Sequence, residues 1–186
     1  MRFLKSSLLS TVAFVFGLAL FTTEKAQAQH PLDLTERAGL TLMVNVGPGY
    51  QHDSQFDSHG TGIGRVSLGV GDFLKNDLAV FLRFSVTNVD HKDGFFPQRQ
   101  TSGFGGVSLQ FWQNSRFFIE TGLGVGFTSE ETSKRQHGGI SALLGTGVTL
   151  YSFGKSNVHF GMEYSPAVVR SDMVHTIGIN IGYQLF

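Results

Sequence analysis

Apolar residues recur at every second position in one segment after another of residues 39–186. A period of two is typical of a β-strand with one apolar face, because successive side chains of a strand point to opposite sides of the sheet. Sustained helical spacing is absent from the same region. The pattern therefore predicts an all-β fold.

About eight segments carry the alternation. They are 40–46, 66–70, 78–86, 107–111, 117–127, 140–150, 158–164 and 177–185. No charged residue interrupts their apolar faces, whereas the opposite faces are rich in Gly, Ser, Thr and Asn. The opposite faces also carry the charges of the predicted strands, Arg65, Arg83, Glu120 and Glu163.

The composition of the polar face indicates which side of the sheet is inside. The surface of a soluble protein is typically ~25–35% charged, but this face is mainly small and uncharged. We therefore predict a closed antiparallel up-and-down transmembrane β-barrel, with apolar side chains outside and a filled, non-conducting lumen. Closure follows because lipid leaves no partner for an open strand edge. A soluble periplasmic lipid-binding barrel, with the apolar faces inside, is an alternative.

The expected connections alternate between long and short. Longer polar loops are predicted at 51–60, 90–102 and 129–138, and tight turns at 113–116 and 152–157, with a longer turn at 71–77. Long loops on one rim and short turns on the other are typical of outer-membrane barrels, with the loops outside the cell. Outward aromatic residues are expected near both rims, where they suit the membrane interfaces. These are Phe111, Phe117 and Tyr183 at the turns, and Phe84, Phe127 and Tyr164 at the loops.

The N-terminal segment has the three zones of a secretory signal. A basic start is followed by an apolar run, about residues 8–21, and by the small-residue motif Ala26-Gln27-Ala28. We expect a signal peptide over 1–28, a short periplasmic segment over 29–38 and a barrel over 39–186. Export by this signal, together with the predicted transmembrane barrel, predicts residence in a bacterial outer membrane.

Charge and cysteine content exclude several classes of protein. The formal net charge is zero, which argues against a surface that follows nucleic-acid phosphates. The chain has no cysteine, so disulfides, thiolate catalysis and Cys-ligated metals are excluded. We expect no cofactor and no metal site.

Residues 39–186 resemble the small eight-stranded outer-membrane barrels, such as the transmembrane domain of outer-membrane protein A and the related X and attachment-invasion proteins. The stretch at 180–186 is similar to the C-terminal signal of this family, carried here by Gly182, Tyr183, Leu185 and Phe186; Gln184 departs from the usual spacing. The resemblance implies that the barrel-assembly machinery, outer-membrane lipid and lipopolysaccharide are partners. It does not identify an extracellular partner.

The strand charges are the strongest candidate for a site. Arg65, Arg83, Glu120 and Glu163 are expected to enter one lumen and to form a polar network. Pairing lowers the cost of burying each charge. Structural cross-bracing is the favoured interpretation, and a gated path for protons or ions is the alternative.

An enzyme is the main functional alternative, since some outer-membrane barrels of this size are lipid A hydrolases that use His, Ser and an acid. His159, Glu163 and Ser165 share one face of a predicted strand. At ~3.3 Å per residue, however, His159 and Ser165 lie ~20 Å apart along that strand, beyond the reach of a catalytic pair. A pair across strands stays open, but we predict a structural or surface-interaction protein.

The predicted loops carry two further candidates. Phe95, Phe96 and Arg99 lie in one loop and are expected to contact a partner or lipid headgroups, or else to fold over the rim. Four loop histidines lie near Asp residues, so a metal or pH-sensitive site is an alternative, but no spacing is diagnostic and we expect them to be solvated loop residues. They are His52, His59, His91 and His137.

Overall fold

A computed structural model describes residues 37–53, 58–91, 98–130, 136–169 and 172–186. Within these ranges the chain forms eight strands that follow one another in an up-and-down order. They are β1 (Gly39–Asp53), β2 (Ser58–Lys75), β3 (Leu78–His91), β4 (Gln98–Trp112), β5 (Phe117–Glu130), β6 (Gln136–Phe153), β7 (Ser156–Val169) and β8 (Asp172–Leu185).

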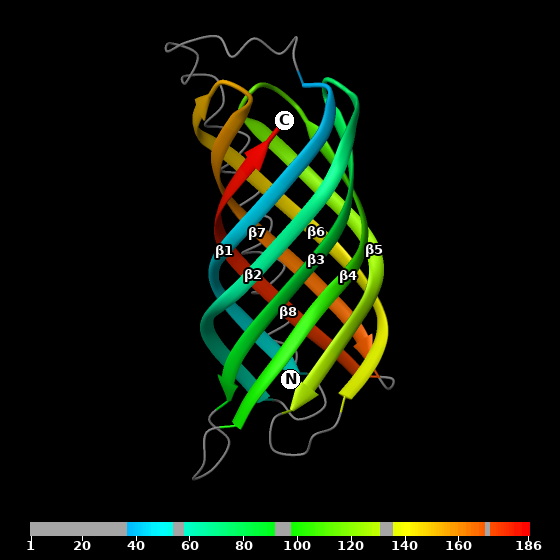
Figure 1. The fold of residues 1–186 in the computed structure, drawn as a ribbon. Helices are drawn as coiled ribbons and strands as arrows, with labels where there is room; N and C mark the ends of the chain where they lie inside the picture. Colours follow the sequence, from blue (N-terminus) through cyan, green and yellow to red (C-terminus); the bar gives the residue numbers. More distant parts are fainter. Residues whose placement is uncertain (1–36, 54–57, 92–97, 131–135, 170–171) are drawn as a thin grey trace, which may run out of the picture. The chain divides into compact units, whose positions relative to one another are not determined.

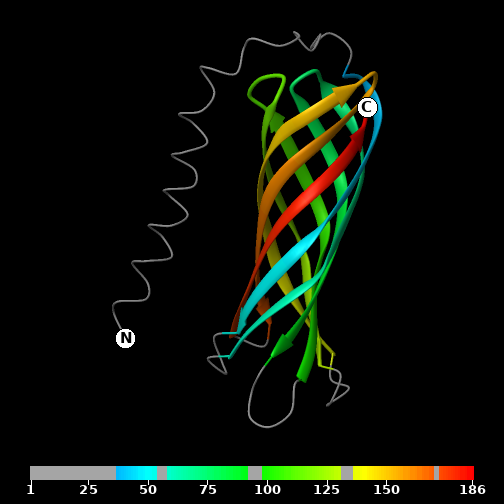
Figure 2. The same ribbon diagram turned by 90° about the vertical axis from the view of Figure 1, so that its left-hand side faces the viewer.

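The sheet closes on itself as an antiparallel barrel. Each strand pairs with the next, and β1 pairs with β8, for example through Val44 and Tyr183. The strands cross the barrel obliquely, and β1 and β8 run side by side in both ribbon views (Figures 1 and 2). Closure removes the unpaired edge that an open sheet would leave. The predicted fold class, an all-β up-and-down barrel of about eight strands, is confirmed.

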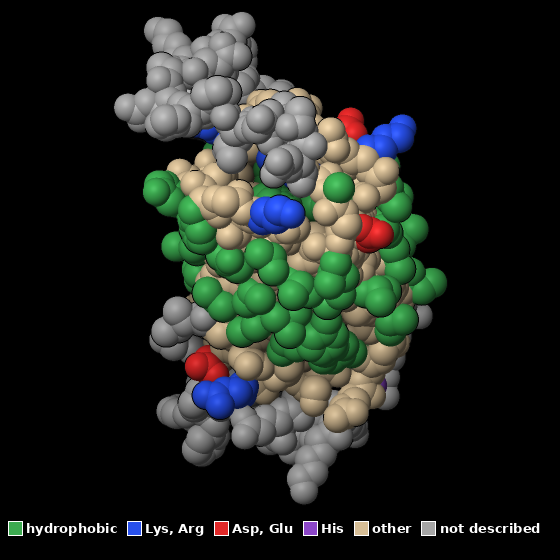
Figure 3. Space-filling view, turned by 45° about the horizontal axis from the view of Figure 1, so that its top comes forward, with side chains coloured by type: hydrophobic (Ala, Val, Ile, Leu, Met, Phe, Trp, Pro, Cys, Tyr) green, Lys and Arg blue, Asp and Glu red, His purple; other side chains and the backbone are tan. Residues whose placement is uncertain are grey.

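Apolar side chains cover the outer face, as the alternation predicted. Every strand contributes exposed apolar residues to the outer face, and we call them the apolar belt. It comprises Leu40, Leu42, Val44, Val46, Val66, Leu68, Val70, Leu82, Phe84, Val107, Leu123, Val125, Ile140, Leu144, Phe160, Ile179 and Ile181. Figure 3 shows apolar side chains gathered over one side of the barrel, with charged side chains toward its ends. The soluble alternative needs these residues inside, and the structure has them outside.

The two ends of the barrel differ in their connections. The turn end joins β2–β3, β4–β5 and β6–β7 through residues 76–77, 113–116 and 154–155. The opposite end, called the loop end, joins the other strands through 54–57, 92–97, 131–135 and 170–171, which lie outside the described residues, as do 1–36 with the expected signal peptide. The strands reach farther than predicted at the loop end, because backbone pairing continues past the apolar stretch, as in Asp90 opposite Arg99.

The lumen at the turn end holds large apolar side chains that the sequence analysis missed. One buried cluster, which we call the aromatic cluster, is formed by Met43, Phe73, Ala79, Phe81, Trp112 and Phe118, and Phe186 packs against it. The expectation of a small and polar inner face is therefore wrong at this end. Phe117, expected on the outer surface, is only 3% exposed. It begins β5 beside a turn in which Asn114 Oδ1 accepts a hydrogen bond from its backbone N–H.

Among the described residues, none belongs to a helix with the length and hydropathy of a membrane span.

Candidate functional site

Four charged side chains meet inside the barrel, and we call them the charged cluster. Arg65 comes from β2, Arg83 from β3, Glu120 from β5 and Glu163 from β7. All four side chains are almost fully buried. Strand alternation turns each of them inward, and the closed sheet brings the four strands around one lumen.

Glycines lie beside each of these long side chains in the strand register. Arg65 is paired with Gly47, Arg83 with Gly69 and Gly106, Glu120 with Gly145, and Glu163 with Gly145 and Gly178. An eight-stranded barrel has a lumen only wide enough for side chains to fill. The inward glycines therefore leave the space that two guanidinium and two carboxylate groups occupy.

The cluster is joined by three ion pairs. Glu163 lies between the arginines, with Arg65 Nη2 at 2.7 Å from Oε2 and Arg83 Nη2 at 2.5 Å from Oε1. Arg83 Nε lies 2.9 Å from Glu120 Oε1. The side chains are 1–4% exposed. Two positive and two negative groups thus cancel in a site shielded from water.

Neutral side chains hydrogen-bond to three members of the charged cluster, whereas Arg65 Nε and Arg83 Nη1 have no hydrogen-bond partner among the described residues. Asn45 Nδ2 donates to Glu163 Oε1 at 2.9 Å, Ser108 Oγ donates to Glu120 Oε1 at 2.5 Å, and Arg65 Nη1 donates to Thr87 Oγ1 at 2.8 Å. A buried ion pair is stable only when further hydrogen bonds satisfy its remaining lone pairs and protons. These contacts tie six of the eight strands, β1 to β5 and β7, to one another across the lumen.

His159 extends the network but is not placed to activate a nucleophile. Its Nε2 lies 3.0 Å from Asn45 Oδ1, and its Nδ1 lies 3.3 Å from Asn157 Oδ1. A general base needs one ring nitrogen within hydrogen-bond reach of the hydroxyl it deprotonates. Here both nitrogens face amide oxygens, while Ser165 lines a separate small interior cavity with Arg65.

The space beside Arg65 gives a direct test of the packing. A Cβ atom at Gly178 would lie 2.2 Å from Arg65 Cδ, so Gly178→Val has to displace the guanidinium from Glu163. We expect a loss of about 1–3 kcal/mol in the free energy of unfolding, measured by urea titration of the protein refolded in lipid vesicles. Gly105→Val is the matched control, because a Cβ there meets only Phe84 Cδ2 at 3.8 Å. Equal stability of the two variants would contradict this packing.

The turn end of the lumen is covered by a cation over aromatic rings, which no sequence signal indicated. Arg37 Cζ lies 3.7 Å above the centroid of Trp112 and 5.2 Å from that of Phe186. Arg37 Nη2 also donates to the Ser115 carbonyl oxygen at 2.9 Å. Burial lowers the pKa of Arg37 to about 10, so the group stays protonated at neutral pH and interacts with the rings as a cation.

Two buried amide side chains, Gln110 and Gln184, adjoin these rings, and we call them the amide layer. Gln110 Oε1 accepts from Trp112 Nε1 and from Gln184 Nε2, both at 3.0 Å. Gln184, the residue that departs from the C-terminal pattern, is therefore an inward side chain that bridges β8 to β4. Of its neighbours in that pattern, Tyr183 and Leu185 are exposed on the outer face, and Phe186 is turned toward the aromatic cluster.

The loop candidates fall partly outside the described residues. This holds for Phe95 and Phe96. Arg99 lies in β4, not in a loop, and its Nε lies 3.3 Å from Asp90 Oδ1.

Among the histidines expected in loops, His52 is in β1 and stacks on His175 of β8 at a centroid distance of 6.2 Å. His59, His91 and His137 lie in β2, β3 and β6. In the described part of the chain, no group of at least three His, Cys, Asp or Glu residues is arranged to hold a metal ion.

Comparisons with known proteins identify the fold. No family model matches the chain, and no curated protein matches it. Among solved structures, the chain is similar to Neisserial surface protein A (TM-score 0.58, 15% identity, 80% of this chain and 97% of that one). It is also similar to Ail, the attachment invasion locus protein of Yersinia pestis, solved with the heparin analogue sucrose octasulfate (TM-score 0.59, 13% identity, 80% and 99%). The chain therefore has the fold of the small eight-stranded outer-membrane β-barrels.

Proposed function

We propose that this chain is an integral protein of a bacterial outer membrane, with a structural or surface-interaction role and a closed lumen. One observation carries the proposal: apolar side chains such as Leu82 and Leu123 are about 70% exposed on the outer face, while the charged cluster is buried inside. Exposed apolar side chains on all sides of a barrel are stable in hydrocarbon and costly in water.

The proposed orientation puts the turn end in the periplasm and the loop end outside the cell. Short periplasmic turns and longer external connections are the usual arrangement of such barrels. The signal peptide over 1–28, the periplasmic segment over 29–38 and the barrel over 39–186 belong to this proposal. Tyr183 and Leu185 are exposed at the outer surface of β8, which supports the proposal that the barrel-assembly machinery reads the last strand.

A closed lumen is proposed because the buried side chains of the charged cluster, the amide layer and the aromatic cluster all occupy it. A small interior cavity beside Arg65, of about 10 Å³, is close to the space that one water molecule requires. We expect no channel activity in planar lipid bilayers that contain the refolded protein. Discrete ion-conducting steps that depend on the protein would favour a gated path through the charged cluster.

The proposed role is not enzymatic. The amide oxygens that face both nitrogens of His159 support this view, because a lipid A hydrolase needs a histidine aimed at a hydroxyl. We expect the acylation of lipid A, measured by mass spectrometry, to be identical in cells with and without the protein. Loss of an acyl chain in cells that make the protein would contradict the proposal.

Cell fractionation tests the proposed location. The protein is expected in the outer-membrane fraction, with electrophoretic migration that changes on heating because a folded barrel resists detergent until it is boiled. Release by osmotic shock, in a form soluble without detergent, would contradict the proposal and favour the soluble lipid-binding barrel.

A further inference from the structure

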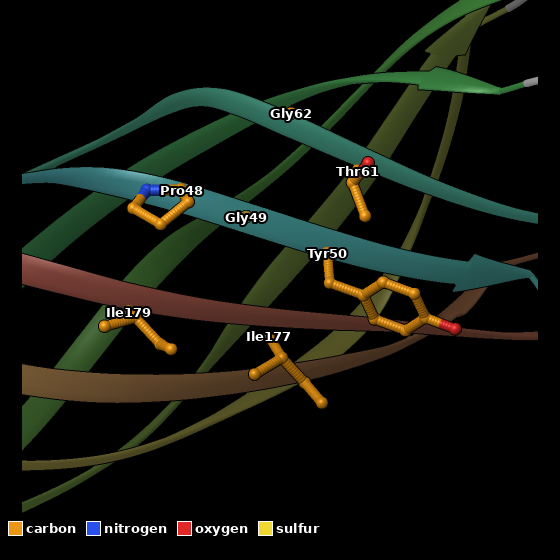
Figure 4. Close-up of a pocket in the computed structure, with 7 residues that line it drawn as sticks. All are labelled: Pro48, Gly49, Tyr50, Thr61, Gly62, Ile177 and Ile179. Carbon is orange, nitrogen blue, oxygen red and sulfur yellow. The ribbon is translucent and has the colours of Figure 1, made fainter.

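A groove interrupts the apolar belt on the outer face of β1, β2 and β8 (Figure 4). Its volume is about 410 Å³, within the ~300–1,000 Å³ of typical small-molecule sites. Its lining is mostly apolar. The lining residues are Pro48, Gly49, Tyr50, Thr61, Gly62, Ile177 and Ile179.

The groove arises from an irregularity of the backbone. The pairing of β1 with β2 skips from Gly47 to Gly49, which leaves Pro48 out of the ladder. Proline lacks the N–H that a ladder hydrogen bond needs, so it is suited to a bulge of this kind. On β2, a Cβ at Gly62 would lie 1.9 Å from the Asn88 carbonyl oxygen. A side chain at this position would meet the backbone of β3, so a glycine is required in this part of the groove.

Polar rings lie at the loop-end side of the groove. Tyr50 is opposite Ile177 in the register of β1 and β8, and the next outward pair is His52 opposite His175, about 7 Å along the strands. The two imidazole rings stack at an interplanar angle of 15°. Tyr164 Oη lies 2.7 Å from His175 Nδ1. The outer face therefore changes from an apolar hollow to a group of hydrogen-bonding rings within two residues.

The Tyr164 hydroxyl engages Nδ1 of His175, as donor or acceptor according to the tautomer of the imidazole. When the phenol donates to Nδ1, the imidazole carries its own proton on Nε2. That N–H can donate a hydrogen bond to an anionic oxygen, and the neighbouring imidazole of His52 supplies a second donor. Imidazole and phenol groups at a membrane interface suit a phosphorylated headgroup, which is anionic and accepts hydrogen bonds.

We propose that this surface binds one molecule of the phosphorylated, acylated glycolipid of the outer leaflet, lipid A. One acyl chain occupies the groove, and a phosphate contacts His52 and His175. The assignment to lipid A, not to a phospholipid, rests on the proposed orientation of the loop end toward the outside. A lipid fits better than a protein partner because the groove is continuous with the apolar belt and its polar groups lie on one side only.

Native mass spectrometry of the protein refolded in detergent micelles tests this inference, with bisphosphorylated lipid A as the probe. The wild type is expected to retain one lipid A per barrel. Thr61→Trp fills the groove and is expected to weaken retention about tenfold. Leu123→Trp is the matched control, since Leu123 lies on β5, 71% exposed and outside the groove, and is expected to bind as the wild type does.

The headgroup contacts are tested separately. A His52→Phe and His175→Phe double variant keeps two stacked rings but removes the donors, and is expected to bind lipid A no better than the wild type binds dephosphorylated lipid A. Equal retention by Thr61→Trp and Leu123→Trp would overturn the proposal, as would equal retention of phosphatidylglycerol and lipid A. All variants are expected to keep heat-modifiable migration. Its loss in the wild type would contradict the membrane barrel itself, which separates the two failures.

Discussion

Glu163→Ala is expected to lower the free energy of unfolding by about 3–5 kcal/mol. Glu163 is paired with both Arg65 and Arg83 at the centre of the lumen. Removal of its carboxylate leaves two adjacent guanidinium groups, of which one keeps only Glu120 as a partner and the other has none in the cluster. Urea titration in lipid vesicles, with the folded fraction read from migration of unheated samples, measures the loss.

Two further variants separate charge imbalance from lost packing. Adding Arg65→Met to Glu163→Ala leaves one arginine and one glutamate, so the double variant is expected to be more stable than Glu163→Ala alone. Arg99→Ala removes an ion pair in which both side chains are about 60% exposed, and its effect is expected to stay within about 0.5 kcal/mol. If Glu163→Ala and Arg99→Ala unfold at the same urea concentration, the charged cluster does not brace the barrel.

Trp112→Ala is expected to cost about 3–5 kcal/mol, the usual range for truncating a large buried aromatic side chain. Trp112 touches Phe118 at a centroid distance of 4.9 Å and Phe186 at 6.0 Å, and its indole N–H bonds to Gln110. The substitution also removes the ring beneath Arg37. Stability is measured in the same urea titration.

The neighbouring position supplies the control for this prediction. Phe111 is the residue before Trp112 on β4, but it points outward and is 43% exposed. Phe111→Ala therefore leaves the lumen intact and is expected to destabilise the barrel less. A larger effect at Phe111 than at Trp112 would mean that the aromatic cluster contributes little to the turn end.

The alternation along the chain was enough to predict the fold, because burial on one face of a strand imposes a period of two. It also put Arg65, Arg83, Glu120 and Glu163 on the inner face, because each lies an even number of positions from its polar neighbours in the strand. The alternation does not fix the ion pairs, which depend on how the strands are staggered around the barrel. Nor does it identify Asn45 as a partner of Glu163, or His159 as a partner of Asn45.

The three features that sequence reasoning missed have different causes. Phe81, Trp112 and Phe118 occupy inward positions in the alternation of their strands. We missed the aromatic cluster because we expected small residues in the lumen. Arg37 precedes the first strand, and its position over Trp112 depends on tertiary packing. The groove beside Pro48 depends on a bulge, and the register that creates it is visible only once β1 has paired with both β2 and β8.

The orientation of the sheet is tested most directly by spin labels placed along β3. Because the chain has no cysteine, single cysteines at Leu82 and Phe84, and at Ser85 and Thr87, each report one position in the refolded, vesicle-embedded protein. Labels at Leu82 and Phe84 are expected to be accessible to oxygen, which concentrates in hydrocarbon, and those at Ser85 and Thr87 to be shielded. The opposite alternation, or equal oxygen accessibility at all four positions, would contradict a barrel with its apolar face in the membrane.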